Sequence, residues 1–272
     1  MADLNRVLIV GCGNMGGAML QGWLAGGMAP ERITVADPGM AAVPTGVTLV
    51  REVPPGHFDV VLLGVKPQLL DAVAPQVAPA LGRGTVLLSI LAGVELATLA
   101  ARFPDAGGIV RIMPNLAAAI GRSPLALAGQ GLDEAGRQAV TTLLQPLGTP
   151  EWLASEDLFD AVTALAGCGP AFVYRYIDAL AAGAVALGVA EDQAQRLALA
   201  TAEGAALLAA SSEHGPGELA RRVASPGGST QAGLDVLDAD SALVRLVEAA
   251  MRAAERRSAE MGREARQADS RG

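Results

Sequence analysis

The stretch VLIVGCGNMGGAML, residues 7–20, joins a short apolar run to a helical pattern through Gly11, Gly13 and Gly16. The spacing G-x-G-x-x-G is typical of a strand that turns directly into a helix. The first glycine allows the tight turn, and the second lets the backbone approach a pyrophosphate. The N-terminus of the helix then presents N–H groups to that anion. We therefore predict a dinucleotide-binding turn near the start of the chain.

The first half of the sequence alternates apolar runs with helical patterns. The runs are apolar throughout, which is typical of strands buried on both faces of a parallel sheet. The pattern predicts an α/β domain with a Rossmann-type doubly wound sheet. The predicted strands are 7–11, 33–37, 47–50, 59–65, 85–91 and 108–114, and the predicted helices between them are 14–27, 67–81 and 94–103.

The character of the sequence changes near residue 155. After GTPEWLASED at 148–157, no strand-like run follows, and Ala/Leu-rich segments with helical spacing take over. We predict a Rossmann domain at 1–155, an all-α domain at 156–266 and a tail at 267–272. The predicted helical segments are 158–188, 190–212, 215–223, about 229–238 and 241–266.

The helical half is apolar on nearly every face, as in LAAGAVALGVA at 180–190. Helices of this kind must bury their apolar faces against another protein surface. We expect homodimerisation through this half, and the alternative is a self-contained bundle packed on the first domain.

Asp37 ends the second predicted strand. An acidic side chain there can accept hydrogen bonds from the adenosine ribose hydroxyls and would repel a 2′-phosphate, which favours NADH. However, Asp37 lies farther past Gly11 than the usual ~20 residues, and DPG is also an ordinary turn sequence. Arg51, after the third strand, is a counter-signal that favours NADPH.

Lys66 is the only lysine of the chain and ends an apolar strand at the carboxyl edge of the predicted sheet, where doubly wound folds bind ligands. The alternative is a solvated strand end. The loops at 89–93 and 113–115 end the next two strands at the same edge. Besides the glycines and Asp37, we predict these cofactor contacts: Asn14, Met15, Val65, Lys66, Pro67, Ala92 and Asn115.

The composition excludes several classes of protein. The 20 basic and 28 acidic residues give a net charge of −8, and no stretch is both basic and aromatic, which argues against a nucleic-acid partner. No apolar run reaches the ~18 residues of a membrane span. The N-terminus lacks a signal-peptide pattern, so we expect a cytoplasmic protein. Two cysteines and two histidines do not have zinc-ligand spacing, and we expect no metal.

The sequence resembles the pyrroline-5-carboxylate reductase family over essentially its whole length. The resemblance rests on GCGNMG at 11–16, GVKPQ at 64–68, VRIMPN at 110–115, DAVTALAGCGPAFVY at 160–174 and VASPGGSTQAG at 223–233. It implies reduction of (S)-1-pyrroline-5-carboxylate to L-proline by NADPH or NADH, the last step of proline biosynthesis. It also implies a dimer that interleaves its helical domains, with a decamer as the further assembly.

The loop ASPGGST at 224–230 contains Gly227 and Gly228. Glycines of this kind can expose backbone N–H groups as an anion-binding nest, here for the substrate carboxylate. Ser229 and Thr230 are also explained in part as an N-cap of the next helix, but that alternative does not explain the two glycines.

The resemblance also implies roles for single residues. Ser225 and Glu213 match substrate-site positions, and Ser229 matches a position that supplies a backbone amide. Thr230 matches a threonine whose hydroxyl faces the ring nitrogen. We expect hydride transfer to C5 and protonation of the nitrogen through Thr230 or a water that it orients.

Several positions depart from the family pattern, namely Leu116, Ala117, Cys168 and Arg222. They leave open a reductase of a related cyclic imine or ketimine, or a catalytically impaired dinucleotide-binding homologue.

Overall fold

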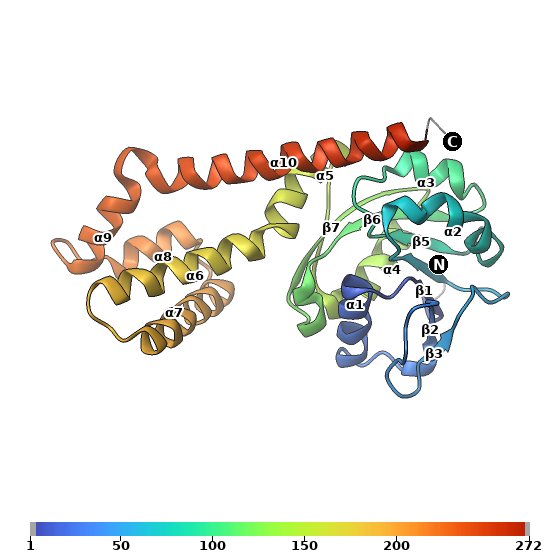
Figure 1. The fold of residues 1–272 in the computed structure, drawn as a ribbon, viewed down its shortest axis with the longest axis horizontal. Helices are drawn as coiled ribbons and strands as arrows, with labels where there is room; N and C mark the ends of the chain where they lie inside the picture. The colour runs from blue at the N-terminus through green and yellow to red at the C-terminus, as the bar shows by residue number, and fades with distance from the viewer. Residues whose placement is uncertain (1–3, 270–272) are drawn as a thin grey trace. The chain divides into compact units, whose positions relative to one another are not determined.

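The computed structural model describes residues 4–269 of the chain, with side chains up to residue 263. The described residues form two compact units. Residues 4–167 and 254–269 make up the first, called the sheet unit here, and residues 168–253 make up the second, called the helical unit (Figure 1). The predicted boundary at residue 155 stays a prediction.

The sheet unit is built on eight strands in the order β3-β2-β1-β4-β5-β6-β7-β8. The first six are parallel, which confirms the predicted doubly wound α/β class. The seventh runs antiparallel to β6 and the eighth parallel to β7. The bounds are β1 Val7–Val10, β2 Ile33–Ala36, β3 Thr48–Val50, β4 Val60–Leu63, β5 Val86–Ser89, β6 Gly108–Met113, β7 Ser123–Gln130 and β8 Gly148–Trp152.

Helices cover both faces of this sheet (Figure 1). Alternate residues of β1 enter different cores: Val7 and Ile9 pack with α1 and α4, whereas Leu8 and Val10 pack with α2 and α3. This alternation follows from the period of two along a strand. The helices are α1 Asn14–Ala25, α2 Leu70–Val77, α3 Leu96–Arg102 and α4 Glu134–Leu144, with a 3₁₀ turn at Pro67–Leu69 before α2.

Two strands were not predicted from the sequence. Strand β7 reads SPLALAGQ and β8 reads GTPEW, and both contain a proline and few β-branched residues, so their propensity is low. Strand β8 lies at the edge of the sheet, where proline is tolerated. Pairing with β6 and β7, not local sequence, makes these segments strands.

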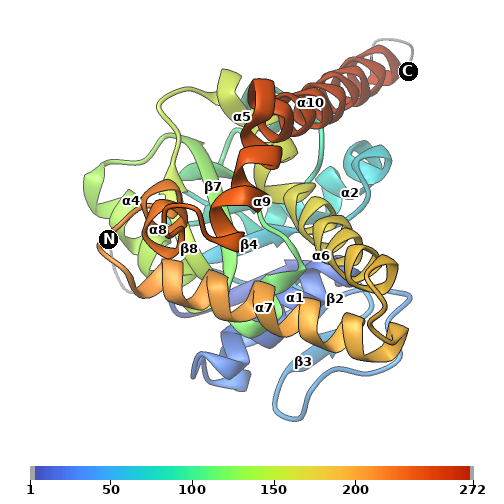
Figure 2. The same ribbon diagram turned by 90° about the vertical axis from the view of Figure 1, so that its left-hand side faces the viewer.

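The helical unit contains no strand among its described residues. Its helices are α6 Gly169–Ala186, α7 Glu191–Ser211, α8 Pro216–Val223, α9 Ser229–Asp238 and the first part of α10 Ala242–Asp269. Helices α6 and α7 pack together through Ala181, Ala194 and Ala198 (Figure 2). The segment predicted as one helix at 158–188 is instead interrupted, with α5 Phe159–Val162, a π-helical turn at Thr163–Gly167 and then α6.

Helix α10 returns to the sheet unit. The Ser258 hydroxyl donates to Asp160 Oδ1 at 2.7 Å. Gly262 lies against Gly93, where an added Cβ would be 3.0 Å from the Gly262 Cα. The helix continues through residue 269, so it includes the first part of the tail predicted at 267–272, and residues 270–272 lie outside the described residues. None of the described helices is both long enough and apolar enough to cross a bilayer.

Candidate active site

The turn between β1 and α1 is shaped by its glycines. Gly11 has φ +81°, a left-handed conformation that glycine adopts without strain. A Cβ on Gly11 would lie 2.7 Å from Val65 Cγ1, and a Cβ on Gly16 would lie 2.9 Å from the Gly11 carbonyl oxygen. Larger residues at these two positions would therefore push β1, β4 and α1 apart.

Gly13 serves a different purpose. It is the N-cap of α1, and no atom lies within 4 Å of the place where its Cβ would be. The space above it is open to a ligand. The first turn of α1 carries no acidic residue, so its N–H groups and the positive end of the helix dipole are available to an anion. The turn thus has the geometry of a pyrophosphate site.

A cavity of about 440 Å³ lies at this edge of the sheet. It brings together five of the predicted cofactor residues. These are Gly11, Gly13, Asp37, Val65 and Lys66, and the cavity is also lined by Val10, Ala36, Pro38, Arg51, Glu52, Val53, Gly64, Leu69, Val73 and Gln76.

Helix α2 also contributes to the cavity through Val73 and Gln76, which were not predicted from the sequence. A signal for it was present, because α2 follows β4 directly and its first turns must lie at the same edge of a parallel sheet.

The Asp37 carboxylate is hydrogen-bonded to the glycine turn. Its Oδ2 accepts the N–H of Cys12 at 2.8 Å, and its Oδ1 accepts the N–H of Gly39 at 2.8 Å. The Arg51 Nη1 donates to the carbonyl oxygens of Pro38 at 3.0 Å and Met40 at 2.6 Å. Two side chains therefore organise the loop that follows β2.

The Cys12 thiol lies within the glycine turn and is buried. Burial, followed by the negative charge of Asp37, raises the pKa of this thiol to about 11. The thiol is therefore neutral at physiological pH, which is unfavourable for a nucleophile.

The other predicted cofactor residues do not line this cavity. Asn14, Met15 and Gly16 lie in the first turn of α1, and Pro67 begins the 3₁₀ turn before α2. Ala92 lies in the loop after β5. The side chain of Asn115 is buried, where Oδ1 accepts the N–H of Ala117 and Nδ2 donates to the carbonyl oxygen of Ala166, both at 2.9 Å.

The glycine loop of the helical unit forms a β-turn at residues 225–228. The Gly228 N–H donates to the Ser225 carbonyl oxygen at 2.9 Å, and Gly227 has φ +71°. Proline at the second position and a positive φ at the third fit a type II turn. The left-handed conformation explains Gly227, which the capping alternative did not.

Helix α9 begins directly after this turn. Its N-cap is Gly228, and no side chain caps it. The hydroxyls of Ser229 and Thr230 are therefore not engaged in capping, and both residues are exposed. The first N–H groups of a helix have no partner within it. The amides of Ser229 and Thr230 are consequently available at the N-terminal end of α9.

The two charged positions singled out near this loop are both exposed. Glu213 lies between α7 and α8. Arg222 donates through Nε to Glu218 Oε1 at 3.0 Å, one turn earlier in α8. Hydrogen bonds from Arg222 and Arg221 lower the pKa of the Glu218 carboxyl. In this chain, Arg222 therefore forms a surface ion pair within its own helix.

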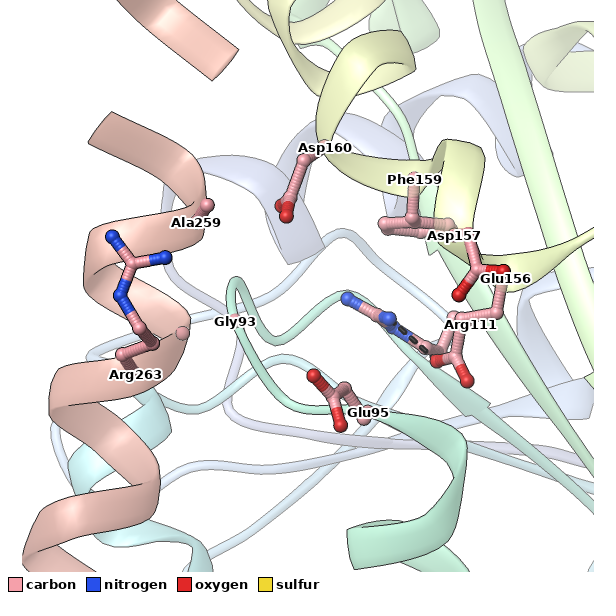
Figure 3. A pocket seen from close by; sticks show the side chains of 10 residues that line it. Gly93, Glu95, Arg111, Glu156, Asp157, Phe159, Asp160, Ala259 and Arg263 are labelled. Carbon is pink, nitrogen blue, oxygen red and sulfur yellow. Dashed lines mark hydrogen bonds and ion pairs between the residues drawn. The ribbon is translucent and has the colours of Figure 1, made fainter. Parts of the chain in front are cut away.

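A second cavity, of about 370 Å³, lies beside the C-terminal part of α10 (Figure 3). Arg111 of β6 points into this region, donates to Glu156 Oε1 at 2.5 Å and stacks on Phe159 at 3.9 Å. Glu156 Oε1 also accepts the N–H of Leu96 at 2.8 Å. This network joins β6, α3 and the segment before α5, and it was not predicted from the sequence.

The described residues include no cluster of three or more His, Cys, Asp or Glu side chains that could bind a metal.

Comparisons with known proteins identify relatives of both halves. Residues 156–261 match a family model described as pyrroline-5-carboxylate reductase dimerisation, and residues 6–93 match one described as NADP oxidoreductase coenzyme F420-dependent. A pyrroline-5-carboxylate reductase of Pseudomonas aeruginosa is 37% identical over 264 residues, which are 94% of this chain and 96% of that protein.

Two solved structures resemble the fold over nearly its whole length. The structure of a pyrroline-5-carboxylate reductase from Coxiella burnetii has a TM-score of 0.87 at 27% identity and covers 94% of this chain and 98% of its own. A pyrroline carboxylate reductase from Plasmodium falciparum, solved with NADP bound, has a TM-score of 0.80 at 25% identity. The match covers 96% of this chain and 99% of that protein.

Proposed function

The chain belongs to the pyrroline-5-carboxylate reductase family, and from this premise we propose which of its residues carry out the reduction of (S)-1-pyrroline-5-carboxylate to L-proline by NAD(P)H. The observation that carries the proposal is the pair of glycine turns. One lies at the end of β1, where Gly13 leaves space for a pyrophosphate. The other lies before α9, where Gly227 has φ +71°.

The cavity at the edge of the sheet supports a site for part of the dinucleotide. Its volume of about 440 Å³ lies within the range of small-molecule sites. In the proposal, the N-terminus of α1 binds the pyrophosphate, and Val65 and Lys66 lie along the cofactor. The residues outside the cavity, namely Asn14, Met15, Gly16, Pro67, Ala92 and Asn115, remain proposed contacts. When bound, the reduced nicotinamide supplies the hydride.

The turn at 225–228 would bind the substrate carboxylate. Because the Gly228 N–H is engaged with Ser225, we assign the carboxylate to the amides of Ser229 and Thr230, with the hydroxyl of Ser225 beside them. Gly227 and Gly228 leave this surface without side chains that would block the carboxylate. Glu213 remains a proposed substrate-site residue.

The chemistry requires one hydride and one proton. The C=N bond of the ring accepts the hydride at C5, and the electron pair of the broken π bond moves to nitrogen. The Thr230 hydroxyl, or a water that it orients, would deliver the proton to that nitrogen and regain one from solvent, which gives the secondary amine of proline and the oxidised cofactor. Since hydride transfer needs no protein nucleophile, we expect most of the rate to come from positioning the two reactants.

The proposed assembly is a homodimer formed through residues 156–261, which match the dimerisation model. A decamer and a cytoplasmic location are further proposals from the family resemblance.

The first test is turnover. Purified protein is mixed with (S)-1-pyrroline-5-carboxylate and NADH or NADPH, and oxidation of the cofactor and formation of L-proline are measured together. We expect stoichiometric conversion. A six-membered cyclic imine carboxylate serves as the comparison substrate, and faster turnover of that ring would replace the proposed substrate.

The second test is Thr230→Ala, which should lower kcat/KM by about 10²-fold or more, because general acid catalysis typically contributes that much. Thr230→Ser should retain most of the activity. Thr201→Ala is the control, since the Thr201 hydroxyl donates to Leu197 within α7. Full kcat/KM in Thr230→Ala would remove Thr230 from the mechanism.

A further inference from the structure

We propose that Asp37 makes this enzyme select NADH over NADPH. The inference rests on the proposed function, because it concerns the cofactor that supplies the hydride, and it names the group that distinguishes two nearly identical dinucleotides. These differ by one phosphate on the 2′ oxygen of the adenosine ribose.

Asp37 lies where that ribose is expected. It directly follows β2, lines the cavity, and accepts the N–H of Cys12, the middle residue of the glycine turn. In doubly wound folds, the pyrophosphate lies on this turn and the ribose next to it at the end of β2. A ligand with its pyrophosphate over Gly13 thus brings its ribose hydroxyls to Asp37.

The carboxylate cannot easily turn away from this position. Each of its oxygens accepts one backbone N–H at 2.8 Å, from Cys12 and from Gly39. A carboxylate oxygen has more than one acceptor site, so both oxygens can still accept a ribose hydroxyl. A 2′-phosphate, in contrast, would place its negative charges against a carboxylate that two amides hold in place.

Arg51 is the residue whose positive charge would favour NADPH. It follows β3, which neighbours β2, and it lines the same cavity. Its Nη1, however, donates to carbonyl oxygens of Pro38 and Met40, in the loop after Asp37. One end of the guanidinium therefore holds this loop, and the carboxylates of Asp37 and Glu52 line the same cavity as Arg51.

Lys66 is the other basic residue that lines the cavity. It follows β4, which is separated from β2 by β1. Neighbouring strands lie ~4.8 Å apart, so the ends of β2 and β4 are roughly 10 Å apart. Lys66 consequently starts two strands away from Asp37, farther along the sheet edge than Arg51, whose strand neighbours β2.

The test measures kcat/KM with NADH and with NADPH, and the Kd of NAD⁺ and NADP⁺ without substrate. We expect the unchanged protein to favour NADH by about 10-fold or more, since like charges in contact cost several kcal/mol. Asp37→Ser and Asp37→Asn should each lower the NADH:NADPH ratio by about 10-fold or more. Asp37→Asn keeps an oxygen that can accept the Cys12 or Gly39 N–H but lacks the negative charge. It therefore tests whether the charge of Asp37 sets the cofactor preference, even if Asp37→Ser unfolds.

The matched control is Asp59→Asn. Asp59 also accepts two backbone N–H groups, from Asn5 at 2.9 Å and Arg6 at 2.8 Å, but it precedes β4 at the opposite edge of the sheet. The control should leave the cofactor ratio unchanged.

Three results would overturn the inference. The first is that the unchanged protein uses NADPH as well as NADH or better. The second is that the NADH:NADPH ratio of kcat/KM is unaltered in both Asp37 variants. The third is that Arg51→Ala selectively loses affinity for NADP⁺. The last result would show that Arg51 binds the phosphate. If the protein binds both cofactors without reducing the imine, the proposed function fails, while the Kd values still decide the role of Asp37.

Discussion

At the scale of single residues, Cys12 links the glycine turn to the stability of the fold. Its thiol is buried and lies beside Asp37, and its pKa rises from 9.0 to about 11. Because the pKa is higher in the folded protein than in the unfolded chain, the thiol stabilises the fold fully below about pH 9, and this contribution is lost as the pH rises towards about 11.

We predict that the free energy of unfolding falls by about 2–3 kcal/mol across this window because of Cys12, and that Cys12→Ala removes this part of the decrease. Urea unfolding at several pH values measures it. Cys168→Ala is the control and should keep the decrease; an equal decrease in Cys12→Ala would assign it to another group.

At the scale of elements, α1 packs on the 3₁₀ segment Leu116–Ile120 by close approach of the two backbones. A Cβ on Gly22 would lie 2.1 Å from the Ala118 carbonyl oxygen and 2.7 Å from Leu147 Cδ2. Gly17 lies in the same helix, but nothing lies within 4 Å of its missing Cβ. The two glycines therefore form a matched pair within one helix.

We predict that Gly22→Ala destabilises the protein by about 1–3 kcal/mol or more, because overpacking outweighs the gain in helix propensity. Gly17→Ala should instead stabilise it by up to about 1 kcal/mol. Thermal or urea unfolding of both variants gives the difference. Equal effects of the two substitutions would mean that α1 can move away from residue 118 without cost.

At the scale of the whole molecule, the helical unit does not contain a core large enough to stabilise it alone. The buried hydrophobic residues of this unit are Ala181, Ala194 and Ala198. Large side chains on the same helices are exposed in the single chain, such as Leu208 at 61% and Leu197 at 55%. Apolar surface of this extent marks a protein interface, in agreement with the dimerisation model that covers residues 156–261.

We predict that Leu208→Glu weakens the dimer and lowers its melting temperature, because a charge would be buried without a partner. Light scattering during size-exclusion chromatography at several dilutions measures the mass. Gln195→Glu adds the same charge at a polar position of α7 and should preserve the dimer. An unchanged mass and melting temperature in Leu208→Glu would place the interface elsewhere on the unit.

Local patterns in the sequence were sufficient to predict the six parallel strands, the glycine turn at 11–16 and most of the helical segments. These features depend on neighbouring residues: apolar runs mark strands buried on both faces, and glycine marks backbone that other residues cannot adopt. The same reasoning found Gly11, Gly13, Asp37, Val65 and Lys66, which the structure brings to one cavity.

Contacts between distant residues were decided only by the tertiary structure. Strands β7 and β8 exist because of their pairing partners, and the end of α10 joins the sheet unit through Ser258 and Asp160, which are 98 positions apart. Asp37 is a candidate for cofactor selection because two amides and Arg51 arrange the loop around it. A sequence specifies backbone conformation locally, whereas the partner of each buried polar group is known only once the chain has folded.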